Sequence, residues 1–267
     1  MSASEGKGKK PAWVIDKERG RRAAAAETVW LFGLHAVRDA LANPARDKLR
    51  LVVTQNAVDR LGDLHGISPE ITDPRVFGKS VPLSPESVHQ GAALEVRPLK
   101  WGSLSEVALR EAPGAVRPLL VALDRVTDPH NIGAILRSAE VFGARAVIAP
   151  HRHSAPETGA LAKSASGALE RQPYLRVPNL AEALTQLKHM GFILIGLDGS
   201  GARALPDVLA DLPGRAICLV LGAEGPGMRE LTAKLCDHVA NIPFAADFGS
   251  LNVSNAAAVA LYAAARP

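Results

Sequence analysis

Residues 118–267 show two alternating patterns of apolar positions. Short runs are apolar at almost every position, which is typical of strands buried on both faces, and longer runs carry apolar residues at helical spacing. Strands of this kind alternating with helices favour an α/β fold whose parallel sheet is covered by helices on both faces. We predict strands at 119–123, 146–149, 192–197, 216–221 and 238–242, and helices at 132–142, 180–190, 228–235 and 253–265.

A shorter pattern of the same kind precedes this region. Apolar residues at helical spacing predict a helix over 33–41, which an Asn-Pro pair ends, and two apolar runs predict strands at 49–53 and 92–96. The segment between these strands is rich in Gly, Pro and Ser. The predicted organisation is a small α/β unit at 29–98, a linker with one short helix at 99–117, and the parallel-sheet unit at 118–267.

The charge of the chain is concentrated at its start. The 267 residues carry a net charge of +4, and residues 1–22 hold seven Lys/Arg against three acids, which accounts for the whole excess. This balance excludes a globally basic coat protein for nucleic acid, so any polyanion site in the rest of the chain must be local. The composition of residues 1–28 predicts a disordered basic arm. A solvated tail without a role in binding explains the same composition.

The remaining composition favours a globular protein of a reducing compartment. A hydrophobic content of 47% excludes general disorder. Cys218 and Cys236 are the two cysteines of the sequence, and their spacing matches neither a disulfide framework nor a CxxC pair. No stretch approaches the roughly 18–20 apolar residues of a membrane span. We therefore expect a cytoplasmic protein.

Ligands of parallel sheets bind beyond the carboxyl ends of the strands, which directs attention to three loops. The first, DRVTDPHNIGAILRSA from Asp124, leads into a predicted helix that Asp128 or Asn131 can cap. Arg137 follows in a run of small apolar residues. It is either a surface residue with a buried stem or a buried cation that needs an anion, and the polar loop before it favours a functional role.

The second loop, LVLGAEGPGM at 219–228, has three glycines that let a ligand approach the backbone closely. It matches neither the GxGxxG pattern of dinucleotide sites nor a P-loop. Glu224 opposes phosphate binding and favours a cationic ligand. A tight strand–helix turn explains the glycines but not the acid between them.

The third loop, at 241–255, opens an otherwise apolar helix with more polar residues than one helix cap requires. Ser250, Asn252 and Ser254 alternate with apolar residues, so a ligand could meet polar side chains and backbone amides together. Helix capping explains one of these residues but not all of them.

The segments DPHNIGAILRSA, LVLGAEGPGM and IP…SLNVS resemble the signature motifs of the SPOUT superfamily, specifically the TrmH/SpoU family of RNA ribose 2′-O-methyltransferases. The resemblance covers roughly residues 29–267. The small unit, with GLHAVRDAL and HQGAALEV, looks like the L30e-like RNA-binding domain of the RlmB type, which methylates a guanosine of 23S rRNA. The resemblance implies an α/β trefoil knot, S-adenosylmethionine as methyl donor, no metal, and a homodimer whose active sites are completed across the interface.

The resemblance also assigns residues. The family's catalytic residues fall on Asn131, Arg137, Glu224, Ser250 and Asn252, and its donor-binding residues on Leu221, Gly222, Gly227, Ile242, Leu251 and Asn252. Methyl transfer to a ribose hydroxyl needs aligned reactants and help with proton loss. Because a guanidinium is rarely deprotonated, we expect Arg137 to bind the adjacent phosphate and stabilise the developing alkoxide. Glu224 would orient Arg137 or the ligand, and Ser250 and Asn252 would hydrogen-bond the ribose or the donor.

The expected function is therefore S-adenosylmethionine-dependent 2′-O-methylation of a guanosine in 23S rRNA. The same chemistry on tRNA, or at an rRNA site that confers antibiotic resistance, is the nearest alternative, and a non-catalytic RNA-binding protein is the alternative from another class. We expect the basic arm to add salt-dependent affinity for RNA. His151 and His153 have no metal-ligand partners nearby in sequence, so we interpret them as a solvated or RNA-facing loop.

Overall fold

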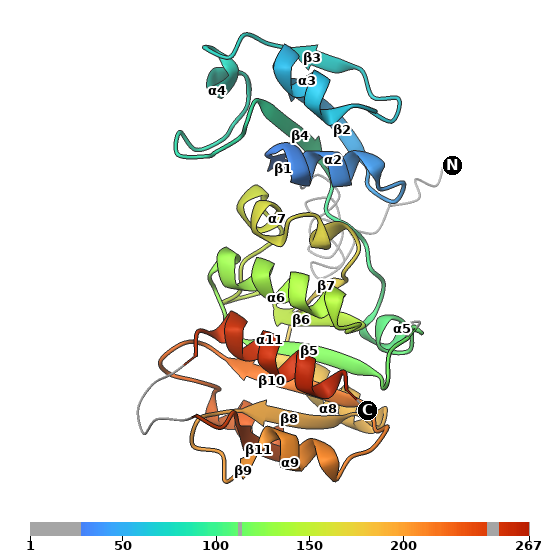
Figure 1. Ribbon diagram of the computed structural model, residues 1–267, viewed down its shortest axis with the longest axis vertical. Helices are drawn as coiled ribbons and strands as arrows, with labels where there is room; N and C mark the ends of the chain where they lie inside the picture. The colour runs from blue at the N-terminus through green and yellow to red at the C-terminus, as the bar shows by residue number, and fades with distance from the viewer. Residues whose placement is uncertain (1–27, 112–113, 245–250, 267) are drawn as a thin grey trace, which may run out of the picture.

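The computed structural model describes residues 28–111, 114–244 and 251–266. It contains a four-stranded and a seven-stranded sheet, one above the other along the long axis of the molecule (Figure 1). The predicted basic arm lies outside the described residues except for Thr28. None of the helices in the described ranges is both long and apolar enough to cross a membrane.

The smaller sheet has the strand order β1-β4-β2-β3. Its central strand β4 pairs antiparallel with β1 and β2, and β3 pairs parallel with β2. The predicted helix and both predicted strands are confirmed as α2, β2 and β4. The elements are β1 (Val29–Phe32), α2 (Leu34–Ala42), β2 (Lys48–Val53), α3 (Gln55–Leu61), β3 (Pro69–Ile71), α4 (Phe77–Ser80) and β4 (Ala92–Val96).

The larger sheet has the order β7-β6-β5-β10-β8-β11-β9, and every neighbouring pair in it is parallel. The predicted parallel sheet is thereby confirmed. Two of its strands were not predicted, because β7 carries a polar Arg176 and β9 has only two residues. The strands are β5 (Leu119–Asp124), β6 (Ala146–Pro150), β7 (Tyr174–Val177), β8 (Ile193–Leu197), β9 (Arg203–Ala204), β10 (Ile217–Gly222) and β11 (His238–Asn241).

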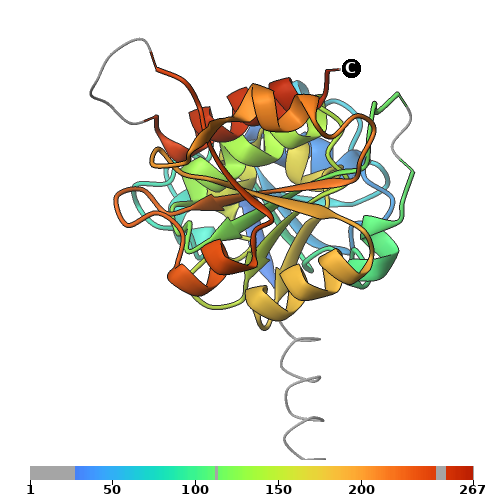
Figure 2. The same cartoon turned by 90° about the horizontal axis from the view of Figure 1, so that it is seen from below.

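Helices cover both faces of this sheet, which is seen edge-on between two helical layers in Figure 2. Along β5, Leu119, Val121 and Leu123 pack towards one layer, and Leu120 and Ala122 pack towards the other. One layer contains α6 (Pro129–Val141), α7 (Gly159–Ala165), α9 (Leu205–Ala210) and α11 (Val253–Ala264), and the other contains α5 (Leu104–Ala108), α8 (Leu180–His189) and α10 (Glu230–Leu235).

The start of α6 differs from the sequence prediction. The helix begins at Pro129, three residues before the predicted start, because the Asp128 side chain caps it by accepting a hydrogen bond from the His130 backbone N–H over 2.9 Å. Proline at the first helical position needs no hydrogen-bond partner for its nitrogen. Of the two predicted caps, Asp128 is therefore the one used, and the Asn131 side chain is available for other contacts.

A buried cluster of charged side chains joins the small unit to the parallel-sheet unit. The Arg46 side chain, fully shielded from solvent, contacts Glu157 at 2.5 Å and Glu170 at 2.6 Å. Asn43 Nδ2 donates to the same Glu170 carboxylate over 2.9 Å. Burial raises the pKa of the Glu157 carboxyl, and the neighbouring Arg46 opposes that rise. The small unit is thus held against the parallel-sheet unit by charges that cannot separate without leaving a buried ion unpaired.

Candidate functional site

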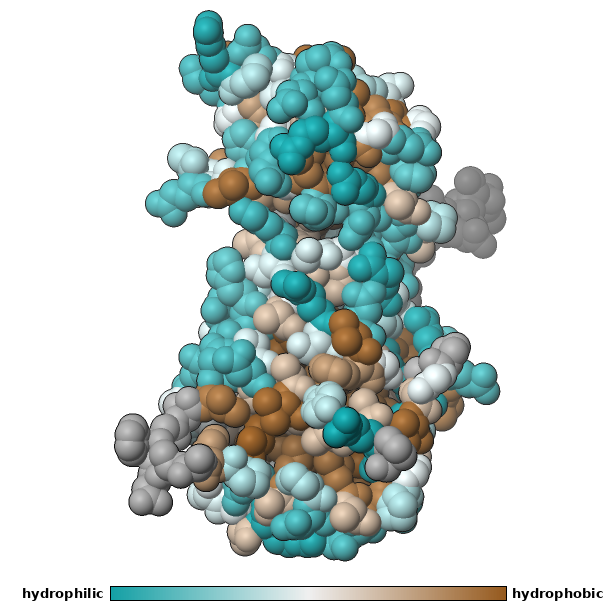
Figure 3. Space-filling view, in the orientation of Figure 1, coloured by the Kyte–Doolittle hydropathy of each residue, from teal (hydrophilic) through white to brown (hydrophobic). Residues whose placement is uncertain are grey.

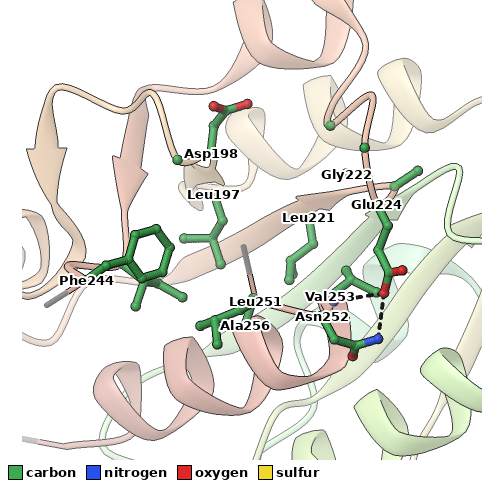
Figure 4. A pocket seen from close by; sticks show the side chains of 15 residues that line it. Leu197, Asp198, Leu221, Gly222, Glu224, Phe244, Leu251, Asn252, Val253 and Ala256 are labelled. Atoms are coloured by element: carbon green, nitrogen blue, oxygen red, sulfur yellow. Dashed lines mark hydrogen bonds between the residues drawn. The ribbon is translucent and has the colours of Figure 1, made fainter. Parts of the chain in front are cut away.

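A cavity of about 460 Å³ lies where the carboxyl ends of β10, β8 and β11 meet the start of α11 (Figure 4). This is the place at which parallel sheets generally bind ligands. Strand side chains Leu197 and Leu221 and helix residue Ala256 give the cavity apolar walls. Its lining is Leu197–Gly199, Leu221–Gly225, Gly227, Ile242, Phe244, Leu251–Val253 and Ala256.

The loop after β10 folds back tightly over the strand end. A Cβ on Gly222 would lie 2.1 Å from the carbonyl carbon of Gly227, so a larger residue does not fit there. Gly227 has a positive φ of 68° and donates its backbone N–H to the Ala223 carbonyl over 2.9 Å. The tight turn thus accounts for these two glycines, and it brings the backbone of the loop into the cavity wall.

Glu224 connects the three loops through its carboxylate. It accepts hydrogen bonds from Asn252 Nδ2 over 2.6 Å, from Asn131 Nδ2 over 3.2 Å and from the Val253 backbone N–H over 3.3 Å. Asn252 Nδ2 also reaches Asn131 Oδ1 at 2.9 Å. Figure 4 shows the Glu224 contacts with Asn252 and Val253 at one side of the cavity, across Leu197 and Leu221 from Phe244. The three residues predicted from separate loops therefore form one polar junction.

A second carboxylate, Asp198, lines the cavity at the end of β8. It accepts hydrogen bonds from the Ser200 hydroxyl over 2.6 Å and the Ser200 backbone N–H over 2.9 Å, and these hold the pKa of Asp198 below its usual range. Asp198 is therefore ionised at neutral pH. Asp198 was not among the residues predicted from sequence, although the Asp-Gly-Ser-Gly turn directly after a predicted strand is a signal that could have identified it.

The described residues that line the cavity include Asp198 and Glu224 but no Lys, Arg or His. Two carboxylates beside apolar walls attract a ligand that has a positive charge and an apolar body, and they repel a phosphate. The expectation that Glu224 disfavours phosphate therefore extends to the cavity as a whole.

The buried carboxylate of Asp124 fixes the far end of the same loop. Asp124 ends β5 and accepts hydrogen bonds from the Arg229 backbone N–H over 2.9 Å and from Arg229 Nε over 2.8 Å. The loop after β10 is thus attached at both ends, to Asp124 and to the polar junction. This attachment keeps the cavity wall in place.

The predicted site residues fall into four groups. Asn131 lies at the polar junction beside the cavity, and Glu224 and Asn252 belong to both. Arg137 is exposed on α6, is not part of the cavity lining, and forms no ion pair or side-chain hydrogen bond with another described residue. Ser250 lies outside the described residues. The predicted donor-binding residues all line the cavity: Leu221, Gly222, Gly227, Ile242, Leu251 and Asn252.

Known proteins that are similar to this chain belong to one family. Residues 118–262 match the model of the SpoU rRNA Methylase family. The 23S rRNA (guanosine-2′-O-)-methyltransferase RlmB of a Burkholderia species is 48% identical over 184 residues, which cover 69% of this chain and 72% of that protein. RlmB of Vibrio vulnificus is 35% identical over 252 residues, which cover 89% of this chain and 96% of that protein.

The fold is also similar to that of a solved structure with a bound ligand. The SpoU methyltransferase AviRb from Streptomyces viridochromogenes, in complex with the cofactor AdoMet, superposes with a TM-score of 0.74 at 25% sequence identity. The match covers 92% of each chain. The similarity therefore includes the smaller sheet as well as the larger one.

Proposed function

This chain belongs to the SpoU rRNA methylase family, and on that premise we propose that it transfers the methyl group of S-adenosylmethionine to the 2′-hydroxyl of a guanosine in 23S rRNA. The observation that carries the proposal is the acid-lined cavity joined to the Asn131–Glu224–Asn252 junction. A cationic donor and a neutral hydroxyl acceptor can meet there. The identity of the RlmB relatives supports the choice of 23S rRNA.

The cavity fits S-adenosylmethionine in size and chemistry. Its volume of about 460 Å³ lies within the roughly 300–1,000 Å³ of small-molecule sites. The acidic side chains of Asp198 and Glu224 suit a sulfonium cation, and Leu197, Leu221 and Ala256 suit an apolar ring. The close approach of Gly222 and Gly227 brings the loop backbone into the cavity wall, where backbone polar groups can bind polar edges of the donor. When bound, S-adenosylmethionine supplies the methyl group.

The protein's own residues would align the acceptor and stabilise its charge. The amides of Asn131 and Asn252, held by Glu224, would position a ribose beside the cavity. Arg137 would bind the neighbouring phosphate and stabilise the alkoxide as the hydroxyl loses its proton. Arg137 has no partner among the described residues of its own chain, so its guanidinium is available for that purpose.

We also propose a homodimer built on an apolar surface of α6 and α11. Val141 is 74% exposed, Val259 44% and Tyr262 47%, and Figure 3 shows apolar surface gathered around α11. Val259 lies one helical turn after the cavity residue Ala256, so this surface is continuous with the cavity wall. Arg137 lies one turn before Val141, so a second copy on this surface would bring an arginine of each chain to the interface.

Val259→Glu is expected to convert the dimer into a monomer and to reduce methyl transfer, because a charge would be buried in an apolar interface. Sedimentation velocity measures the change. Leu231→Glu is the matched control, since Leu231 is 61% exposed on α10, at the opposite face of the sheet. A Val259→Glu protein that remains dimeric would contradict the assignment of this surface.

Glu224→Gln is expected to weaken S-adenosylmethionine binding by about 10-fold, because it removes a negative charge and replaces charge-assisted hydrogen bonds with weaker neutral ones. Calorimetric titration of the donor measures this. Glu230→Gln, at an exposed acid on α10, is the control and should leave donor binding unchanged. Equal dissociation constants for Glu224→Gln and the wild type would remove Glu224 from the donor site.

The fold and location of the enzyme complete the proposal. Strand β10 lies between β5 and β8, although both of these strands come earlier in the chain. This insertion supports a trefoil knot in residues 118–267. We assign residues 29–98 to an L30e-like RNA-binding domain and 99–117 to the linker. A ribosomal substrate implies the cytoplasm, and both cysteines, Cys218 and Cys236, are free thiols.

Calorimetry separates this proposal from the alternative of a non-catalytic RNA-binding protein. The enzyme should bind S-adenosylmethionine, and a chain that binds RNA but no donor would be a binding protein only. The alternative substrates are tRNA and a resistance site of rRNA. Mapping 2′-O-methyl groups in rRNA and tRNA from a deletion strain distinguishes them, because the methyl group disappears from the true target.

A further inference from the structure

The carboxyl edge of the large sheet is divided by charge. The β10 and β8 side holds the cavity with its two carboxylates, Asp198 and Glu224. The β5 and β6 side carries four exposed basic side chains: Arg125, Arg152, His153 and Lys163. None of these four side chains forms a hydrogen bond or ion pair with another described residue. We call these four residues the cationic strip.

Strand register places the cationic strip beside the cavity. Asp124 of β5 is paired with Gly222 of β10, which lines the cavity, and Arg125 is the next residue. Neighbouring strands lie about 4.8 Å apart, so the loop that begins at Arg125 starts one strand spacing from the cavity wall.

A hydrogen bond joins the next loop to this one. The buried Ser154 hydroxyl donates to the Val126 carbonyl over 3.0 Å. His153 directly precedes Ser154, and Arg125 directly precedes Val126. Both His153 and Arg125 are exposed and basic. The loop after β6 therefore carries Arg152 and His153 to the side of Arg125.

Arg125 and His153 also share an unusual backbone conformation. Their φ angles are 64° and 62°, in the left-handed region that non-glycine residues rarely adopt. Such a conformation is strained and persists where neighbouring contacts enforce it, which is common at functional sites. Here the Ser154–Val126 bond lies between the two strained residues and fixes both loops with their side chains pointing away from the core.

The packing of α7 on α6 adds Lys163 to the strip. Ser164 Oγ and His130 Nδ1 are 2.9 Å apart, and a Cβ on Gly133 would lie 2.5 Å from the Ser164 Cβ. Lys163 thus lies next to the start of α6, where Asn131 contacts Glu224. Figure 1 shows α7 between α6 and the smaller sheet.

We infer that Arg125, Arg152, His153 and Lys163 bind phosphates of the RNA strand that flank the reacting ribose. The inference rests on the proposed function and adds the path of the substrate to it. Since the acidic cavity repels phosphate, the basic side of this edge offers the strand the more favourable electrostatic path. Asp128, the exposed carboxylate of the adjacent loop, caps α6 by accepting the His130 backbone N–H. It is one acid beside the three permanent cations Arg125, Arg152 and Lys163, so the net charge of this side stays positive.

The test uses the full-length chain with Arg125→Ala, Arg152→Ala and Lys163→Ala combined. Binding to an in vitro 23S rRNA transcript is measured over a series of salt concentrations. Each cation that neutralises a phosphate contributes about 0.7 to the slope of log K against log salt, so removing three cations should lower the slope by about 2. We expect RNA affinity to fall by at least about 10-fold at low salt, with S-adenosylmethionine binding by calorimetry unchanged.

Arg215→Ala is the control for the removal of an exposed cation elsewhere on the surface. Arg215 is exposed and unpaired among the described residues, but it precedes β10 at the amino edge of the sheet. It should leave the salt slope unchanged.

A triple variant with the affinity and slope of the wild type would overturn the inference, and methyl transfer by that variant would leave the proposed function intact. If the wild type transfers no methyl group but the triple variant still loses RNA affinity and slope, the cationic strip stands and the proposed function fails. The two results are therefore separable.

Discussion

Replacement of Arg137 by alanine is expected to lower methyl transfer at least about 100-fold, while S-adenosylmethionine binding and thermal stability stay unchanged. Loss of one group that stabilises developing negative charge typically costs about 100- to 1,000-fold in rate. Arg137 is exposed and has no partner among the described residues, so its removal leaves no buried group unpaired. It does not line the cavity, so donor binding should persist. The expected loss therefore lies in the chemical step.

Arg137→Lys tests whether the positive charge alone is enough for catalysis or whether the planar guanidinium is needed. A lysine keeps the positive charge but lacks the planar pair of donors that binds phosphate oxygens. We expect partial recovery of methyl transfer relative to Arg137→Ala. Single-turnover rates with saturating donor measure both variants, and Arg215→Ala serves as the control at an exposed arginine far from the junction. A fully active, folded Arg137→Ala enzyme would exclude Arg137 from catalysis.

Replacement of Arg46 by methionine is expected to lower the free energy of unfolding by about 3–5 kcal/mol at neutral pH, because Glu157 and Glu170 would remain buried without their cation. Denaturant unfolding followed by circular dichroism measures this. Arg50→Met is the matched control. Arg50 binds Glu70 through two guanidinium nitrogens, but both side chains are exposed, so the loss of Arg50 should lower the free energy of unfolding far less than the loss of Arg46.

The effect of Arg46→Met should also depend on pH. Burial raises the pKa of Glu157, and without the opposing Arg46 it rises further. An acid whose folded-state pKa is raised costs stability above that pKa and nothing below the unfolded value of about 4.3. The difference from the wild type should therefore shrink as the pH falls from about 7.5 towards 5. A difference that stays constant over this range would show that the lost stability has another origin.

The elements that carry the site could be predicted from sequence because their signals are local. The strands β5, β8 and β10 are continuous apolar runs, and α6 and α11 show helical spacing after polar loops. The elements that were missed have weak local signals. The helix α7 is formed by small residues after the Thr158 cap, and α9 is only six residues long. Their positions are set by packing against other elements rather than by their own pattern.

The composition of the site was predictable, but its connections were not. Motifs selected Asn131, Glu224 and Asn252, whereas the hydrogen bonds among them depend on how strands far apart in the sequence lie in one sheet. The same holds for Arg46, which meets Glu157 and Glu170 across more than a hundred residues. A sequence pattern indicates which residue types are present and which face of a helix or strand they occupy. The order of the strands in the sheet determines which of these residues come into contact.

Methyl transfer itself is the most direct test of the proposed function. The wild-type chain is incubated with S-adenosylmethionine carrying a tritiated methyl group and an unmodified 23S rRNA transcript, and the labelled nucleotide is identified after digestion. We expect the tritiated methyl group on the 2′-oxygen of a guanosine. A labelled base, or RNA that stays unlabelled although the protein binds the donor, would contradict the proposed function.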